Sequence, residues 1–212
     1  MPDGRAGVVL LVPVLAPFTM AGVFWWLRRV LPGHVAYNVG FLVYWVGWCA
    51  AFPLWVLGRR RVAVLLRTAS RPSALDGALL AFPVMGAVAT ELWPNRRRID
   101  RALATAMVGA GVVNAVTEEV LWHGVFSECF PDDAVRGVVW PLAGFTFWHL
   151  APQIILPARI SRGRFLLGAL AVGAAGSVVA RRQQGLLATT LSHALVDSAG
   201  VRANEFRLGR RR

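Results

Sequence analysis

Long apolar runs, separated by short stretches rich in arginine, dominate the pattern of this chain. A bilayer-spanning helix needs about 20 mainly apolar residues, and seven runs approach that length. They cover residues 7–27, 35–57, 74–93, 102–126, 135–157, 164–180 and 184–201. The last two runs are short, so they can tilt, or one of them can be re-entrant. The pattern predicts an all-α, polytopic transmembrane helical bundle of about seven spans, with a range of six to eight.

The runs divide the chain into parts without indicating a second domain, because no internal repeat or shift in composition is present. Residues 1–101 contain about three N-terminal spans and basic loops, residues 102–201 form a helical core, and residues 202–212 form a basic C-terminal tail. The connector at residues 59–71 interleaves arginines with valines and leucines. It is either an amphipathic helix in the headgroup region or an ordinary polar loop, and both interpretations stay open.

Composition strengthens the membrane interpretation. The chain is 56% hydrophobic and only 16% charged, with a mean hydropathy of +0.53, which is too apolar for an ordinary soluble domain. Several of its tryptophans stand at the edges of apolar runs, as in the aromatic belts of membrane proteins. We therefore expect an integral, multi-pass membrane protein whose surface contacts lipid.

The net charge of +12 comes from 23 arginines and no lysine. Nucleic acid is not the expected partner, because the arginines gather at the ends of the apolar runs and leave no solvent-facing basic domain. With seven spans, the side that carries the C-terminus holds the larger share of arginines, so the positive-inside rule favours a cytoplasmic C-terminus. Arginine without lysine is typical of a high-GC bacterial genome, and we expect the bacterial plasma membrane as the location.

Six ionisable side chains interrupt the apolar runs of the second half of the chain. They are Glu118, Glu119 and His123 in residues 102–126, His149 in residues 135–157, and His193 and Asp197 in residues 184–201. A charge at mid-bilayer costs roughly 2.5–3.5 kcal/mol on insertion scales, so such groups normally face a polar interior and act there. Singly, each has an ordinary explanation in snorkelling or packing. One shared site inside a helical bundle explains them all, and glutamate with histidine is suited to activating water.

The spacing of these residues along the chain indicates which of them can pair on one helix face. Residues four apart lie on one helix face, so Glu119 and His123 can pair and leave Glu118 as the free carboxylate. Asn114, four residues before Glu118, would line the same cavity wall. His193 and Asp197 are also four apart, stacked about 6 Å along the helix axis. Asp197 can orient His193, or both can point at a shared ligand.

Three short motifs carry a family resemblance. The run EEVLWHG at residues 118–124 resembles the EExxxR motif of the CPBP intramembrane proteases, a family also called Abi or CAAX proteases. FTFWH at residues 145–149 is similar to the family's FxxxH motif, and HALVD at residues 193–197 is similar to HxxxN/D. The resemblance covers about residues 107–200, while the first three spans match only in being hydrophobic. Together, in this order and on successive membrane segments, the three motifs are fairly specific.

The resemblance implies a helical membrane endopeptidase, related to the enzymes that remove the last three residues of prenylated CAAX proteins. It implies that Glu118 is the general base and that His149 is its partner in activating water. His193 and Asp197 would stabilise the oxyanion, and Glu119 would be structural or auxiliary. The substrate would be a membrane-anchored peptide or protein, and in a bacterium a peptide-processing role is favoured over a prenylated substrate.

Two residues depart from the simplest form of that family pattern. His123 stands where the family has arginine, and histidine braces a carboxylate less firmly and in a pH-dependent way. His123 could also supply a third imidazole to the site. Asp197, as an anion, would repel a developing oxyanion unless it is protonated or paired with an imidazolium at His193.

A metal cofactor is left open by the sequence, so the cofactor is either none or zinc. Glu118, His149 and His193 would form a plausible two-histidine, one-glutamate zinc set with an open position for water. The chain lacks HExxH, so nothing local requires zinc, and a metal-free mechanism is favoured.

Two other functions remain as alternatives to the peptidase. A catalytically inactive membrane scaffold or immunity-type protein could retain the polar cavity, as the change at His123 permits. Buried Glu and His also mark ion paths, so a proton- or metal-coupled transporter is a weaker hypothesis. The absence of an inverted repeat from the sequence disfavours it.

Overall fold

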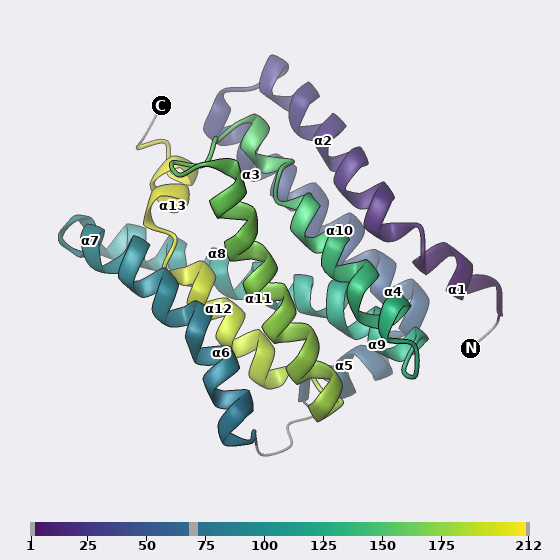
Figure 1. Ribbon diagram of the computed structural model, residues 1–212. Helices are drawn as coiled ribbons and strands as arrows, with labels where there is room; N and C mark the ends of the chain where they lie inside the picture. Colours follow the sequence, from purple (N-terminus) through teal and green to yellow (C-terminus); the bar gives the residue numbers. More distant parts are fainter. Residues whose placement is uncertain (1–2, 68–71, 211–212) are drawn as a thin grey trace.

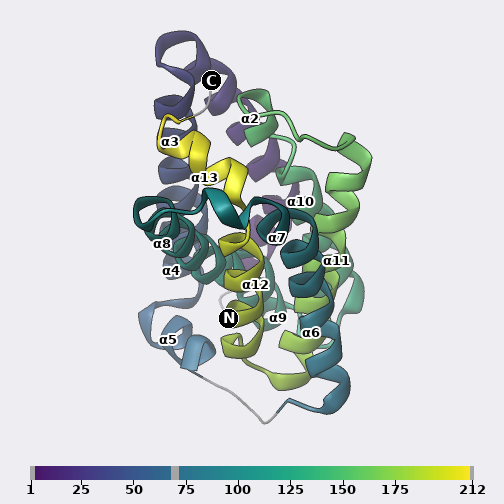
Figure 2. The ribbon, with the colours of Figure 1, turned by 90° about the vertical axis from the view of Figure 1, so that its left-hand side faces the viewer.

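The chain forms a bundle of helices (Figures 1 and 2), and the computed structural model describes residues 3–67 and 72–210. Every regular element in these ranges is helical, so the predicted all-α class is confirmed. The α-helices are α1 (Asp3–Val9), α2 (Val12–Val30), α3 (Gly33–Val43), α4 (Phe52–Leu57), α5 (Arg59–Arg67), α6 (Ala74–Ala87), α7 (Trp93–Asn95), α8 (Arg101–Glu118), α9 (Phe126–Cys129), α10 (Trp140–Trp148), α11 (Arg162–Gln183), α12 (Leu187–Ser198) and α13 (Val201–Arg207).

Several predicted spans are composite, because segments of other helical geometry continue the α-helices. The π-helical segments are η1 (Tyr44–Ala51), η2 (Val88–Leu92), η4 (Glu119–Val125) and η5 (Val135–Val139). The 3-10 segments are η3 (Arg96–Arg98) and η6 (Pro152–Ile154). Among the described residues, three helical stretches are long and apolar enough to cross a membrane, namely Gly33–Leu57, Ala74–Arg98 and Arg162–Gln183.

One predicted run is shorter as a helix than its hydropathy suggests. The run at residues 135–157 stays helical only to Trp148, and His149 follows as the C-terminal capping residue. Pro152 has no backbone N–H, so it cannot donate the hydrogen bond that would continue the helix past Trp148. Apolarity extends past the point where the helix stops, so His149 lies at a helix end rather than inside a span.

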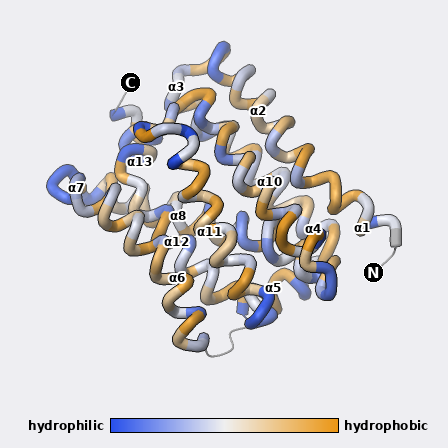
Figure 3. The backbone as a smooth tube through the Cα atoms, viewed as in Figure 1, coloured by the Kyte–Doolittle hydropathy of each residue, from blue (hydrophilic) through white to orange (hydrophobic). Residues whose placement is uncertain are grey.

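The outer surface of the bundle is apolar, as expected for lipid contact. Large side chains on three helices point outward, with exposed fractions of 75% for Phe18, 68% for Phe82 and 64% for Leu167. In Figure 3 hydrophobic colour runs along the helices, while hydrophilic colour gathers at their ends and in the connections. Exposed apolar surface on this scale would be unfavourable in water. The fold is an all-α bundle of an integral membrane protein.

Local sequence explains where several helices begin. Ser73 and Asp76 form a capping box at the start of α6, each side chain bonding the other's backbone N–H. The Asp100 carboxylate accepts a hydrogen bond from the Leu103 amide at 2.8 Å and caps α8. These caps satisfy amide groups that the first turn leaves without helical partners.

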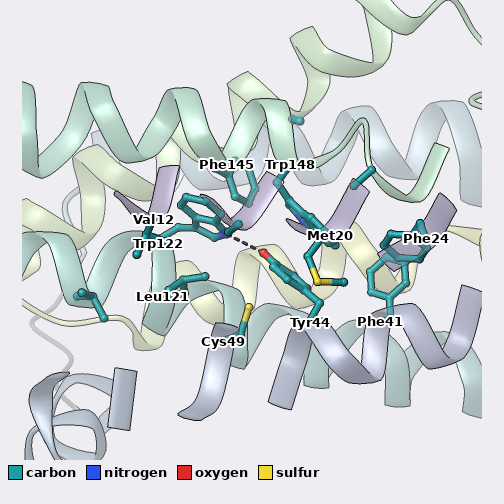
Figure 4. Close-up of a cluster of buried hydrophobic side chains, with 14 of the residues drawn as sticks. Val12, Met20, Phe24, Phe41, Tyr44, Cys49, Leu121, Trp122, Phe145 and Trp148 are labelled. Carbon is teal, nitrogen blue, oxygen red and sulfur yellow. Dashed lines mark hydrogen bonds between the residues drawn. The ribbon is translucent and has the colours of Figure 1, made fainter. Parts of the chain in front are cut away.

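An aromatic core joins the first helices to the second half of the chain (Figure 4). The ring of Tyr44 stacks on Trp148 with centroids 3.6 Å apart, and its hydroxyl accepts a hydrogen bond of 2.7 Å from the Trp122 indole. Phe24 and Phe41 pack against the same Trp148 ring. Residues far away in sequence thereby fix Trp148, which directly precedes His149 in the chain.

Helices α8 and α12 pack closely because one glycine lies between them. A Cβ atom on Gly111 would lie 2.9 Å from the backbone nitrogen of Ser198 and 2.5 Å from its Oγ. Only a residue without a side chain permits this approach. The close contact brings together the two helices that carry most of the ionisable groups.

The two basic segments, the connector at residues 59–71 and the C-terminal tail, both contain a helix. Helix α5 occupies the described part of the connector at residues 59–71, with Leu65 buried against Val120 and Leu186, and residues 68–71 lie outside the described residues. In the stretch predicted as a basic tail, α13 is packed: the Arg207 guanidinium lies over the Phe41 ring at 4.3 Å. Residues 211 and 212 also lie outside the described residues.

Candidate active site

Three elements place the predicted site residues around one buried cluster. The first is α8 with its continuation η4, which carry Asn114, Glu118, Glu119 and His123. The second is α10, which His149 caps at its C-terminus, and the third is α12, with His193 and Asp197. The close packing of α8 on α12 accounts for most of the convergence. His149 joins the cluster at its edge rather than through a hydrogen bond to another predicted site residue.

Glu118 is held by two donors and is almost fully buried, with 1% of its surface exposed. Its Oε1 accepts a hydrogen bond of 2.7 Å from the Trp148 indole, and its Oε2 accepts one of 3.1 Å from the Asn114 amide. A buried carboxylate with partners on both oxygens has a fixed orientation. The aromatic stack behind Trp148 supports that orientation from the N-terminal helices.

His193 lies between carboxylates on both sides of its ring. Its Nδ1 is 3.0 Å from Glu119 Oε1, while its Nε2 lies 3.6 Å from Glu118 Oε2 and 3.5 Å from Asp197 Oδ2. A neutral imidazole has one donor and one acceptor nitrogen, whereas an imidazolium donates from both. With acceptor oxygens facing both nitrogens, the arrangement suits an imidazolium, one of the conditions under which Asp197 would not oppose an oxyanion.

Asn114 bridges two carboxylates that would otherwise repel each other. Its Nδ2 donates to Glu118 Oε2 at 3.1 Å and to Asp197 Oδ2 at 2.8 Å. Its Oδ1 accepts a hydrogen bond of 2.7 Å from the Trp45 indole. Because an indole N–H only donates, Trp45 fixes which end of the amide faces the carboxylates. Both amide hydrogens are thereby used, so Asn114 positions the acids.

Glu119 and His123 form the contact that their spacing predicts. His123 Nδ1 lies 2.7 Å from Glu119 Oε2, and the other oxygen of Glu119 faces His193. The His123 ring also lies against Gly176 of α11, where an added Cβ would approach its Cε1 to 2.6 Å. Glu119 therefore connects the two histidines, and the glycine on the neighbouring helix leaves room for the His123 ring.

His149 has a defined tautomer, and within the described residues no hydrogen bond reaches its second ring nitrogen. Its Nδ1 lies 2.7 Å from the Phe145 carbonyl oxygen, which only accepts, so the hydrogen is on Nδ1. Nε2 is then the basic nitrogen of the neutral ring. His149 and Asp197 are partly exposed, unlike Glu118 and His193, and Asp197 and His193 are within electrostatic range of His149. The accessible side of the cluster is therefore the side of His149 and Asp197.

Sequence reasoning missed the neutral partners and the local backbone. Nothing in the sequence spacing of Trp148 and Trp45 predicts a contact with Glu118 or Asn114. Glu119 and His123 lie in a π-helical segment, η4, where regular α-helix was expected. Such segments frequently occur at functional sites. A tryptophan directly before the motif histidine was the one available signal for Trp148.

The arrangement does not form a zinc site as it stands. In residues 3–67 and 72–210, no group of three His, Cys, Asp or Glu side chains is arranged to hold a metal ion. His149 turns its Nδ1 to a carbonyl, and both nitrogens of His193 face carboxylates. Zinc at Glu118, His149 and His193 therefore stays a prediction that these contacts do not support.

Comparison with known proteins adds the family to this geometry. Residues 100–199 match the family of type II CAAX prenyl endopeptidases described as Rce1-like. No curated protein and no solved structure matches the chain. The matched range contains every predicted site residue and starts at the N-terminal cap of α8. This Rce1-like match supports an assignment of the chain to the CAAX protease family, also called CPBP.

Proposed function

We propose that the protein is an intramembrane endopeptidase in which Glu118 and His149 activate a water molecule. The proposal rests on one observation above all: a buried carboxylate, fixed by Trp148 and Asn114, lies beside an imidazole that faces carboxylates on both sides. A fixed acid–base pair next to a positive group is suited to attack on a carbonyl carbon and to holding the resulting oxyanion.

The proposed steps use the side chains alone. A water molecule between Glu118 and Nε2 of His149 loses a proton to Glu118 as its oxygen attacks the scissile carbonyl carbon. The carbonyl oxygen becomes an oxyanion, which accepts a hydrogen bond from the Nε2–H of His193. The proton on Glu118 then passes to the leaving nitrogen, and the peptide bond breaks. Asp197 and Glu119 keep His193 charged and oriented throughout.

The proposed substrate is a peptide or protein anchored in the membrane, in keeping with a site among helices whose outer surface is apolar. Lipid is the surrounding partner, and the bacterial plasma membrane is the proposed location. His149 and Asp197 lie on the accessible side of the cluster, so the scissile bond would enter there. Several classes of membrane-anchored peptide fit this description equally well.

One observation favours a second candidate, an inactive scaffold or immunity-type protein. Glu118, Glu119 and His193 satisfy one another in a nearly closed network, with exposed fractions of 1%, 1% and 3%. Such a network can stabilise a bundle without catalysis. His123 at the position of the family's arginine suits that function as well.

Replacing Glu118 by glutamine separates the two candidates. The change keeps the shape of the side chain but removes the base, so peptidase activity should fall by about 10²–10⁴-fold. Glu128→Gln makes the same chemical change in a surface pair with Arg61 and should leave activity unchanged. The measurement is cleavage of a quenched library of membrane-anchored peptides by purified protein in detergent.

The same assay tests whether the reaction needs a metal and whether His123 has inactivated the enzyme. A chelator-treated sample should retain its activity if the side chains act alone, and loss restored by zinc would contradict the metal-free steps. Full turnover by the Glu118→Gln protein would overturn the proposed peptidase. If the folded wild type cleaves nothing, activity gained by His123→Arg would indicate a decayed enzyme, and continued silence would favour the scaffold.

A further inference from the structure

A hollow lined by three arginines shares no lining residue with the acid–histidine cluster. It has a volume of about 620 Å³ and is lined by Pro94, Asn95, Arg98, Arg159 and Arg202. The arginines come from three separate segments: η3, the connection before α11, and α13. In Figures 1 and 2, α7 and α13 lie near each other at the end of the bundle where the chain terminates.

The positive charge in the hollow is only partly neutralised. Arg98 pairs with Glu205 at 2.6 Å, and it also approaches the Asn95 side-chain oxygen at 3.4 Å. Among the described residues, the side chains of Arg159 and Arg202 make no ion pair or hydrogen bond. Guanidinium groups that share a hollow repel each other unless an anion lies between them. The remaining charge favours an anionic ligand.

The position of the hollow indicates where that anion would be found. It adjoins the end of the membrane-length stretch Ala74–Arg98, beside Trp93, which is 62% exposed and has the Arg96 guanidinium over its ring at 4.0 Å. Exposed tryptophan with arginine is typical of the headgroup level of a bilayer. The arginine distribution predicts a cytoplasmic C-terminus, and the cytoplasmic leaflet is rich in anionic lipid.

We propose that this hollow, lined by Arg98, Arg159 and Arg202, is a binding site for a phosphate group, supplied by an anionic lipid headgroup or by free phosphate. The planar guanidinium forks match phosphate oxygens and can bind them bidentately. Pro94 offers no backbone donor, so the arginine side chains supply the recognition. The inference does not depend on peptidase activity, because none of these residues belongs to the proposed catalytic cluster.

The test is titration calorimetry on the full-length protein in a non-ionic detergent. The probes are a short-chain phosphatidylglycerol, phosphatidylcholine of the same chain length, and inorganic phosphate. Phosphatidylglycerol should bind at least tenfold more tightly than phosphatidylcholine. If phosphatidylglycerol also binds at least tenfold more tightly than phosphate, the lipid is the source; similar affinities would assign the site to free phosphate.

A charge-matched pair of variants decides whether the hollow itself binds. The double variant Arg159→Gln/Arg202→Gln should weaken phosphatidylglycerol binding about 25-fold, from a roughly fivefold contribution per arginine. Arg162→Gln/Arg164→Gln removes the same charge at the start of α11, outside the hollow, and should change binding less than twofold. If the first double variant fails to fold, Arg159→Gln alone, at an exposed position, should still give about fivefold.

Two outcomes would overturn the site. Equal weakening by both double variants would show that a diffuse positive field, rather than the hollow, attracts the lipid. Equal binding of phosphatidylglycerol and phosphatidylcholine would show that the contact is with the acyl chains.

Discussion

The two halves of the molecule contribute different things to one cluster. Residues 100–199 provide every ionisable group of the candidate site, whereas the helices before them provide neutral aromatic partners such as Trp45 and Tyr44. Charges in a low-dielectric interior need partners with fixed geometry, and aromatic residues supply packing together with single N–H or O–H groups. A domain recognised by its motifs is thus completed by a part of the chain without motifs.

The largest expected effect concerns the packing of α8 on α12, the two helices that carry most of the ionisable groups. Gly111→Ala would push α8 away from α12, because its Cβ would meet backbone atoms of Ser198. We expect a stability loss of about 1–3 kcal/mol, and activity about 10²-fold lower if the site shifts by about 1 Å. Thermal unfolding in detergent and peptide cleavage are the measurements.

A neighbouring glycine on the same helix supplies the control for that change. Gly109 has nothing within 4 Å of the position of an added Cβ, so Gly109→Ala should stabilise the helix by about 0.5–1 kcal/mol. Activity of this variant should be unchanged. If the two alanine variants behave alike, the close approach of α8 and α12 is not what assembles the site.

The contribution of the N-terminal half is tested by removing one hydrogen bond. Trp45→Phe keeps a ring but removes the donor to Asn114, which frees the amide to turn. We expect activity to fall about tenfold and stability by about 1 kcal/mol, because the acceptor left unpaired is only partly buried. Peptide cleavage and thermal unfolding of purified protein measure both.

Trp48→Phe is the matched control for Trp45. The Trp48 indole donates to Thr19 at an exposed position, 3.2 Å away, and touches no site residue by hydrogen bond. This variant should retain wild-type activity. A similar loss in both variants would mean that the first helices act through general packing and not through Asn114.

The smallest expected effect lies at the junction of the two halves. The Leu103 amide and the Arg210 guanidinium donate hydrogen bonds that hold the pKa of the Asp100 carboxyl below its ordinary value. The resulting stability is present above the ordinary pKa of roughly 3.9 and is lost as pH falls through the lower, folded value. Asp100→Asn should therefore lower Tm slightly at pH 7.

Acid should remove that difference in Tm. Below the lowered pKa of the folded protein, the carboxyl of Asp100 is protonated and as neutral as the amide of the variant, so the two melting curves should converge. Thermal unfolding across this range measures the effect. A gap that stays constant with pH would mean that charge at Asp100 does not stabilise the junction.

Much of the fold and part of the site were predictable because they follow from local rules. Helices come from runs of apolar residues, and contacts such as Glu119 with His123 come from a spacing of four on one helix. The end of the helix at Trp148 was not predicted, since hydropathy continues past it and Pro152 acts only through its missing backbone N–H. The three motifs indicated the same cluster before any contact was known.

The sequence by itself determined an all-α membrane bundle, the identity of the ionisable groups and the family to which they point. Composition, periodicity and short spacings are local properties, so they can be read along the chain. Only the tertiary structure decided that Trp148 holds Glu118, that Trp45 orients Asn114, and that His193 lies between carboxylates. These contacts join residues from about 30 to more than 70 positions apart, and they depend on how closely helices pack. A glycine at position 111, with no side chain of its own, sets that closeness.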